Sequence, residues 1–382
     1  MLKKTLLILT LVSIACIVAL TLTVVDSAEV DAEKTAKKVK ISDKPSIVTL
    51  ATVMKSFRGS LSEELLADAS FPLGHKEMYS WSNLPPSQGQ DRGGIEFSRL
   101  SEEQSSLFYK VLDAFLSDEG YTKVSRITTR SETDIEKIGH DFWQRRPYFI
   151  ALFGNPETDG AWGFQLDGHH LSLNFLVHGD EVLIVPSHLG AQPATINGNA
   201  VLGKERSNAL ALLNSLDEEQ QKKAIQPGRR GLKVGPGGTT DPHLNYDYSH
   251  FKGIGIKASE MDEKQKESLR DLIKAYVYNL EAEFADVWMK DIERDINDTY
   301  FVWIGGTTEN DSIYYRVFNP AVWIEFNDEG RGTDHIHTIT RAPNGNDYGI
   351  FALNRGPRTL AEHYAMADHH NSSHPYFDYT TN

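Results

Sequence analysis

Apolar residues recur at helical spacing in three segments of the chain. A capping-box pattern begins at Ser101, and the apolar repeat behind it predicts an amphipathic helix over 102–118. A second pattern begins at Ser259 and predicts the start of the strongest helix, whose apolar stripe runs from Leu269 to Trp288. A third helical stretch is expected between about 204 and 225. Because each stretch is apolar on one side, these helices are expected to cover a core.

Strand patterns fall into two blocks. In the first, Trp162–Leu166 and His169–Val177 flank the dipeptide Asp167-Gly168, which favours the type I′ turn of a tight hairpin. In the second, short apolar runs are separated by turns rich in Gly, Asn and Asp, at Tyr300–Ile304, Ile313–Phe318, Ala321–Phe326 and His335–Arg341. The predicted fold class is therefore α+β, with antiparallel sheets (a hairpin and a four-strand meander) covered by amphipathic helices.

The N-terminal segment has the layout of an export signal. Lys3 and Lys4 precede an apolar run from about residue 6 to 25, and the chain becomes polar at Asp26. We expect a signal peptide over 1–27, a polar linker over 28–45 and a single domain over 46–382 with a histidine-rich C-terminal tail. The protein is then secreted or periplasmic. The alternative is an uncleaved membrane anchor, since about 20 apolar residues are just long enough to span a bilayer.

Composition narrows the chemistry. Cys16 is the only cysteine, so a chain cleaved after residue 27 has no disulfide, thiolate ligand or cysteine nucleophile. The formal net charge of −14 disfavours nucleic acid and anionic membrane surfaces as partners, and a small-molecule substrate or ligand is expected instead. The stretch 226–255 is dense in Gly and Pro and carries Asp241, His243, Asp247, Tyr248 and His250, so it is expected to be either a functional loop or disordered.

A His-x-His pattern marks the last predicted strand. His335 and His337 are two residues apart, so both side chains leave the same face of a strand, about 7 Å apart along it. Glu325 lies on the preceding predicted strand and completes a set of two histidines and one carboxylate if the register brings it opposite. Such a set suits a transition metal ion: zinc, iron, manganese or copper. The alternative is that the histidines only form hydrogen bonds across the sheet.

The predicted hairpin contributes two more histidines. A turn at Asp167-Gly168 would pair Leu166 with His169 and Gln165 with His170, so the two histidines would point to opposite faces. His169 then faces the core, and His170 shares a polar face with Gln165. The C-terminal tail carries four more histidines, at His363, His369, His370 and His374, which are dense enough to bind transition metals weakly but are expected instead to form a solvated tail.

Several segments together resemble one family. Pro147–Pro193 reads PYFIALFGNPETDGAWGFQLDGHHLSLNFLVHGDEVLIVPSHLGAQP, Tyr300–Gly306 reads YFVWIGG, and Tyr314–Gly349 carries Tyr-Tyr-Arg, Ile-Glu-Phe, His-Ile-His-Thr and Asn-Asp-Tyr-Gly in order. This set is similar to the domain of unknown function 3500 over about residues 48–365. The resemblance implies a shared fold and site but no reaction. The family's motifs fall on Trp162, Gly168, His169, His170, Glu325, His335, His337, Arg341, Asn346, Asp347 and Tyr348. One departure is Ser187-His188, where a Phe is expected nearby, and this puts a role for His188 in doubt.

The leading hypothesis is a metal-dependent enzyme, a hydrolase or an oxygenase, with its site in a polar cleft. Glu325, His335 and His337 are its expected metal ligands. His170 is a further ligand or a general acid/base, and Arg341 holds an anionic substrate group. A rival hypothesis is a non-catalytic exported protein that binds a small ligand with the aromatic side chains of Trp162, Tyr314 and Tyr315. A third is a cell-surface interaction module held by the uncleaved anchor.

Overall fold

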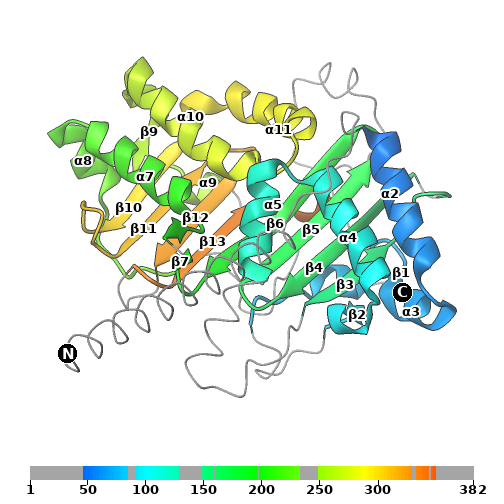
Figure 1. Ribbon diagram of the computed structural model, residues 1–382. Helices are drawn as coiled ribbons and strands as arrows, with labels where there is room; N and C mark the ends of the chain where they lie inside the picture. The colour runs from blue at the N-terminus through cyan, green and yellow to red at the C-terminus, as the bar shows by residue number, and fades with distance from the viewer. Residues whose placement is uncertain are drawn as a thin grey trace, which may run out of the picture. The chain divides into compact units, whose positions relative to one another are not determined.

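The computed structural model describes residues 46–84, 92–128, 148–158, 160–196, 198–232, 248–328, 333–343 and 346–349. Through these residues runs one mostly antiparallel sheet of eleven strands (Figure 1). Its strands are β1 (Ser70–Phe71), β2 (Ile95–Glu96), β3 (Phe149–Phe153), β4 (Ala161–Gly168), β5 (Leu171–His178), β6 (Glu181–Ala191), β9 (Ile256–Lys257), β10 (Tyr300–Gly305), β11 (Ile313–Phe318), β12 (Trp323–Asp328) and β13 (Ile336–Arg341). Their order is β1-β3-β4-β5-β6-β13-β12-β11-β10-β9, with β2 beside β3; only β1 and β3 pair in parallel within the described part. A separate ribbon joins β7 (Thr195–Ile196) to β8 (Asn199–Ala200). The predicted α+β class is confirmed.

Most of the helices cover one face of this sheet, and in Figure 1 they stand in front of the strands. The short helix α9 (Tyr248–Phe251) instead packs against the core on the other face. The ring of Phe115 packs edge-on against Phe164 and Phe175, at centroid distances of 5.1 Å in both cases. Further along the sheet, the hydroxyl groups of Tyr276 and Tyr315 are hydrogen-bonded to each other. The helices are α2 (Ile47–Ser60), α3 (Glu63–Ala69), α4 (Glu102–Phe115), α5 (Asp118–Arg126), α7 (Gly203–Ser215), α8 (Glu218–Ala224), α9 (Tyr248–Phe251), α10 (Glu263–Val277) and α11 (Ala282–Arg294).

The predicted helix 102–118 is α4, and each of the other two predicted helical stretches is a pair of helices. The stretch 102–118 ends as α4 at Phe115, because the Ser117 side chain accepts a hydrogen bond from the Gly120 amide and starts α5. Asp217 separates α7 from α8 in the same way, accepting from the Gln220 amide. An amphipathic pattern that continues through a cap cannot reveal the break, since both helices bury the same stripe.

The predicted cap at Ser259 is wrong. Ser259 lies in a short 3-10 turn, and the capping box that opens α10 joins Asp262 to Gln265. The apolar stripe that continues to Trp288 is carried by a second helix, α11. The chain breaks between them because the backbone of Asn279 and Glu281 bonds to the α4–α5 junction. The spacing of apolar residues cannot show that backbone groups form hydrogen bonds with a distant segment instead of continuing the helix.

The predicted meander is confirmed in β10 to β13, and the predicted hairpin in β4 and β5. The two blocks join through β6, which pairs with β5 on one side and with β13 on the other. This strand was not predicted, because Pro186 and Gly190 lie within it and both residues weaken a strand pattern. Its pairing makes one continuous sheet of the two blocks.

The position of the hairpin turn differs from the prediction. The register pairs Gly168 with Leu171 and Gln165 with Asn174, so the two turn residues are His169 and His170. Asp167 stays in the strand because its carboxylate is held by the Arg92 guanidinium and by the Ser82 amide. Tertiary contacts therefore shift the turn by two residues from the Asp-Gly signal.

A second core lies on the other face of the sheet. Phe251 packs edge-on against Trp323 with ring centroids 4.6 Å apart, and Tyr348 packs against Tyr79 in the same way at 5.0 Å. The cluster consists of Met78, Trp81, Ala151, Phe153, Leu176, Tyr300, Val302, Phe318, Trp323, Ile339 and Tyr348. The sheet is therefore covered on both faces, which explains why the polar strand residues Gln165, Ser172 and Asn174 are buried.

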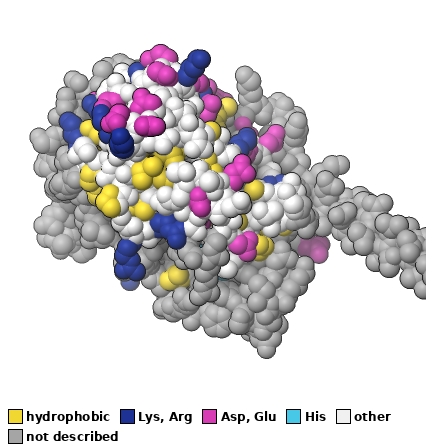
Figure 2. Space-filling view, turned by 90° about the vertical axis from the view of Figure 1, so that its left-hand side faces the viewer, with side chains coloured by type: hydrophobic (Ala, Val, Ile, Leu, Met, Phe, Trp, Pro, Cys, Tyr) yellow, Lys and Arg dark blue, Asp and Glu magenta, His cyan; other side chains and the backbone are white. Residues whose placement is uncertain are grey.

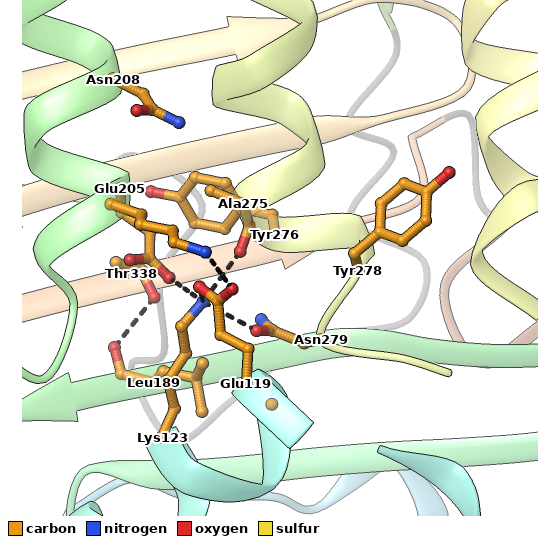
Figure 3. A network of polar contacts seen from close by, with 12 residues as sticks. Glu119, Lys123, Leu189, Glu205, Asn208, Ala275, Tyr276, Tyr278, Asn279 and Thr338 are labelled. Atoms are coloured by element: carbon orange, nitrogen blue, oxygen red, sulfur yellow. Dashed lines mark hydrogen bonds and ion pairs between the residues drawn. The ribbon is translucent and has the colours of Figure 1, made fainter. Parts of the chain in front are cut away.

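A buried ionic network ties the helices together (Figure 3). The ammonium of Lys123 lies 2.7 Å from the carboxylate of Glu205, which is fully buried, and 3.1 Å from that of Glu119. It also donates to the Ala275 carbonyl and to the Asn279 side chain, at 3.0 and 2.9 Å. Burial raises the pKa of Glu205, and the charge of Lys123 opposes this rise. The network joins α5, α7 and α10 on the helical side of the sheet.

Charged side chains of both signs are mixed on the face shown in Figure 2. Elsewhere in the described residues, exposed ion pairs join Lys222 to Glu219, at 2.6 Å, and Lys223 to Glu260. Among the helices that the structure describes, none is long and apolar enough to cross a membrane. The predicted signal peptide and linker, residues 1–45, lie outside the described residues.

Candidate metal centre

Three histidines from two distant parts of the chain meet at one end of the β6–β13 pair. His170 comes from the β4–β5 turn, while His335 immediately precedes β13 and His337 lies near its start. The Nε2 atoms of His170 and His335 are 3.1 Å apart, and one potential donor nitrogen from each of the three side chains lies within 4.8 Å of the others. Donor atoms around a tetrahedral zinc ion are about 3.3 Å apart, given zinc–nitrogen bonds of about 2.0–2.1 Å. The triad could therefore bind a metal ion with small side-chain adjustments.

The backbone fixes the position of His170. Its φ angle is +63°, a left-handed conformation that histidine adopts more readily than bulky residues do. Its amide donates to the Asn83 carbonyl at 2.9 Å, and its carbonyl accepts from the Gly190 amide at 2.7 Å. The His169 ring stacks on the His170 ring at 3.8 Å. The turn is therefore held from three sides, which places the His170 imidazole over β6.

Gly190 leaves the space that the imidazoles occupy. It lies directly opposite His337 in the β6–β13 register. A Cβ atom at Gly190 would lie 2.8 Å from Cδ2 of His337 and 3.2 Å from Cδ2 of His170. Carbon atoms in ordinary contact are about 3.5–4.0 Å apart. Any larger residue at this position would therefore push the two rings away from the sheet.

His188 and Asn83 form the wall of the cluster, and the sequence reasoning assigned neither of them a role. The His188 ring is fully buried, with its centroid 5.3 Å from that of His337 and 6.1 Å from that of Trp81. Its Nε2 lies 3.4 Å from the Asn83 amide nitrogen. The signal that could have found His188 is its i−2 spacing from Gly190, which puts it on the same strand face as the triad.

Burial keeps the deepest of these imidazoles neutral. Desolvation, followed by the neighbouring histidines, lowers the pKa of His170 and that of His188 well below the ordinary value. The same causes, with Arg92 as a further contributor, lower the pKa of His169 to about 3. A neutral imidazole offers a lone pair, which is the form that a metal ion needs.

Glu325 lies on the same strand face as His337 but is not brought into the triad. The register places Asn327 opposite His337, and Glu325 opposite Ile339. The carboxylate of Glu325 is fully buried and accepts a 2.5 Å hydrogen bond from the Tyr314 hydroxyl. It is absent from the group of donors found within the described residues. Its role as a metal ligand stays a prediction. The third donor beside His335 and His337 is His170.

Arg341 lies further along the same strand. It is four residues beyond His337, which corresponds to about 13 Å at the rise of a β-strand. Its guanidinium is buried and donates to Asp347 at 2.7 Å, while the other Asp347 oxygen accepts from the Ala342 amide. Burial raises the pKa of Asp347, and Arg341 opposes the rise. The predicted contact of Arg341 with an anionic substrate is not tested by this arrangement.

The other residues proposed for the site, Gln165 and the aromatic residues of the binding hypothesis, do not gather around the triad. Gln165 donates to Asn174 at 2.6 Å, and Asn174 donates to the Pro186 carbonyl at 2.7 Å, so this polar run is closed by internal hydrogen bonds. Trp162 packs against Phe115 on the helical side. The three aromatic residues of the binding hypothesis are divided between the two faces, since Tyr314 and Tyr315 alternate along β11. The candidate residues Asp241, His243, Asp247, His363, His369, His370 and His374 lie outside the described residues.

Fold and site together define an α+β protein with a histidine triad between a hairpin turn and a meander. The family described as "Protein of unknown function (DUF3500)" matches residues 43–350. The chain therefore belongs to the DUF3500 family, as the sequence motifs indicated. No curated protein and no solved structure matches the chain.

Proposed function

We propose that this protein is an exported metal-dependent hydrolase whose metal ion is held by His170, His335 and His337. The observation that carries the proposal is the convergence of three donor nitrogens, one from each side chain, within 4.8 Å. A metal bound by three histidines keeps at least one coordination position open, as catalytic zinc sites do. When bound there, such an ion lowers the pKa of a coordinated water and so supplies a nucleophile at neutral pH.

The donor set favours hydrolysis over oxygenation at an iron centre of the common type. Mononuclear iron oxygenases commonly use two histidines and one carboxylate. Here the third donor is His170, and the carboxylate of Glu325 is bonded to Tyr314. His170 is buried, so surrounding atoms hold its side chain in place. His335 is half-buried, so its side of the centre lies nearer to solvent. This asymmetry supports a site that substrate reaches from the His335 side.

The test is metal content of protein purified without an affinity tag and reconstituted with Zn²⁺ or Co²⁺. We expect close to one equivalent in the wild type and a loss of at least tenfold in affinity for His335→Ala, which removes one donor. His178→Gln is the matched control, because His178 lies at the far end of β5, about 23 Å from the turn at the rise of a strand. A metal-loaded protein that hydrolyses no ester, amide or phosphoester would support a binding protein instead.

A further inference from the structure

We infer that the ion pair between Arg92 and Asp167 is a positioning pair for the metal centre, which acts by holding the segment 82–84 against the turn formed by His169 and His170. The inference rests on the proposed metal centre and names residues that position a ligand without touching the metal. It follows from the contacts that both side chains make with this segment.

Arg92 and Asp167 hold the segment by its backbone. One oxygen of the Asp167 carboxylate accepts a hydrogen bond from the Ser82 amide at 2.9 Å, and the other lies 3.1 Å from Nε of Arg92. Nη2 of Arg92 donates to the carbonyl of Ser82, at 2.9 Å, and to that of Leu84. The pair is therefore bonded to the backbone on both sides of Asn83.

Asn83 connects this segment to the metal centre. Its carbonyl accepts a hydrogen bond from the His170 amide at 2.9 Å, and its side-chain nitrogen lies 3.4 Å from Nε2 of His188. A shift of Asn83 would therefore move the backbone of His170 and change the surroundings of the His188 ring. Because metal–ligand distances tolerate changes of only about 0.2 Å, even a small shift of this backbone would weaken coordination.

The pair also fixes the place of the turn. The dipeptide Asp167-Gly168 favours a turn by itself, yet Asp167 is paired with Ser172 in the β4–β5 ladder. The bonds that the Asp167 carboxylate makes to Arg92 and to the segment oppose this local preference. The turn therefore falls on His169 and His170.

Stability alone does not account for a buried ion pair at this position. The side chains of Arg92 and Asp167 are only 3% and 2% exposed. Because removing two charges from water costs about as much free energy as their attraction regains, apolar residues of similar volume would often stabilise a fold equally well. Apolar residues cannot supply a donor and an acceptor directed at the backbone of the segment. A positioning role accounts for both the burial and the direction of these groups.

The experiment compares Zn²⁺ affinity, by isothermal titration, with the urea midpoint of the metal-free protein in variants of the full mature protein. Asp167→Asn should weaken Zn²⁺ binding by about tenfold or more and change the visible absorption of the Co²⁺-loaded protein. Asp347→Asn is the matched control, because the buried Asp347 carboxylate also bonds to an arginine Nε, that of Arg341, and to a backbone amide, that of Ala342. It should lower the urea midpoint similarly and leave the Zn²⁺ affinity and the cobalt spectrum unchanged. An unchanged affinity in folded Asp167→Asn would overturn the inference, and so would an equal loss of affinity in both variants.

A double-mutant cycle tests whether the pair acts through the backbone of His170. In a His170→Ala background, Asp167→Asn should cause a smaller further loss of Zn²⁺ affinity than it does alone, whereas fully additive losses would contradict this route. If Asp167→Asn does not fold, Arg92→Lys takes its place: it keeps a charge beside Asp167 but loses the branched guanidinium that bonds to the two carbonyls. Unchanged affinity in that variant would also overturn the inference. Failure of the wild type to take up Zn²⁺ or Co²⁺ would instead refute the metal centre, so the two failures are distinguishable.

Discussion

Gly190→Ala tests whether the close approach of the imidazoles to β6 is what makes the donor set. The added methyl group would lie 2.8 Å from Cδ2 of His337 and 3.0 Å from the Ile336 carbonyl oxygen. An ordinary carbon–carbon contact needs about 3.5–4.0 Å, so the His337 ring must move by about 0.7–1.2 Å. Metal–ligand distances tolerate changes of only about 0.2 Å. The substitution should therefore disturb coordination by several times the permitted error.

The expected result is a loss in metal affinity of about 10–100-fold, together with a destabilisation of about 1–3 kcal/mol from overpacking. Isothermal titration with Zn²⁺ measures the first quantity, and urea unfolding of the metal-free protein measures the second. Gly160→Ala is the matched control, because a Cβ atom there meets nothing within 4 Å. If Gly190→Ala binds Zn²⁺ as tightly as the wild type while remaining folded, the imidazoles do not act as donors in the positions described.

Three further outcomes follow from other parts of the molecule. His188→Phe should keep the fold, as circular dichroism would show, but should weaken Zn²⁺ binding by about 10–100-fold, because the phenyl ring has no nitrogen to contact Asn83. Unchanged affinity would mean that His188 serves only in packing. Glu205→Gln should lower the free energy of unfolding by about 1.5–3 kcal/mol in urea, because Lys123 loses its fully buried charged partner and keeps only Glu119, whereas Lys123→Met with Glu205→Leu should be close to neutral; equal effects of the two would contradict this reasoning. Mass spectrometry of the exported fraction should find a mature terminus near Ala28, and a full-length, membrane-retained chain would support the anchor.

Patterns of local alternation predicted the fold class, the hairpin and the meander. Strand positions in β10 to β13 follow from period-two apolar runs between turn residues, and these runs are read directly from sequence. The strand β6 was missed because Pro186 and Gly190 have low strand preference, yet Gly190 is there to admit the imidazoles. The strand pattern of β6 is weak because the site requires a glycine at position 190.

The composition of the site depended on long-range pairing, which no local pattern specifies. His170 and His335 are 165 residues apart in sequence and meet because β6 pairs with both β5 and β13. The role of Glu325 rested on an assumed register, and the observed register puts Asn327 opposite His337 instead. A shift of two residues keeps a side chain on the same face but moves it about 7 Å along the strand. Sequence reasoning could therefore identify the face of the sheet but not the third donor.

The most direct measurement is anomalous diffraction at the absorption edge of the metal, from crystals of the reconstituted protein. We expect a single strong peak about 2.0–2.1 Å from one nitrogen of each of His170, His335 and His337, with one or more further positions held by water or an anion. A peak elsewhere, or less than a tenth of an equivalent of metal at the triad, would show that these histidines are joined only by hydrogen bonds.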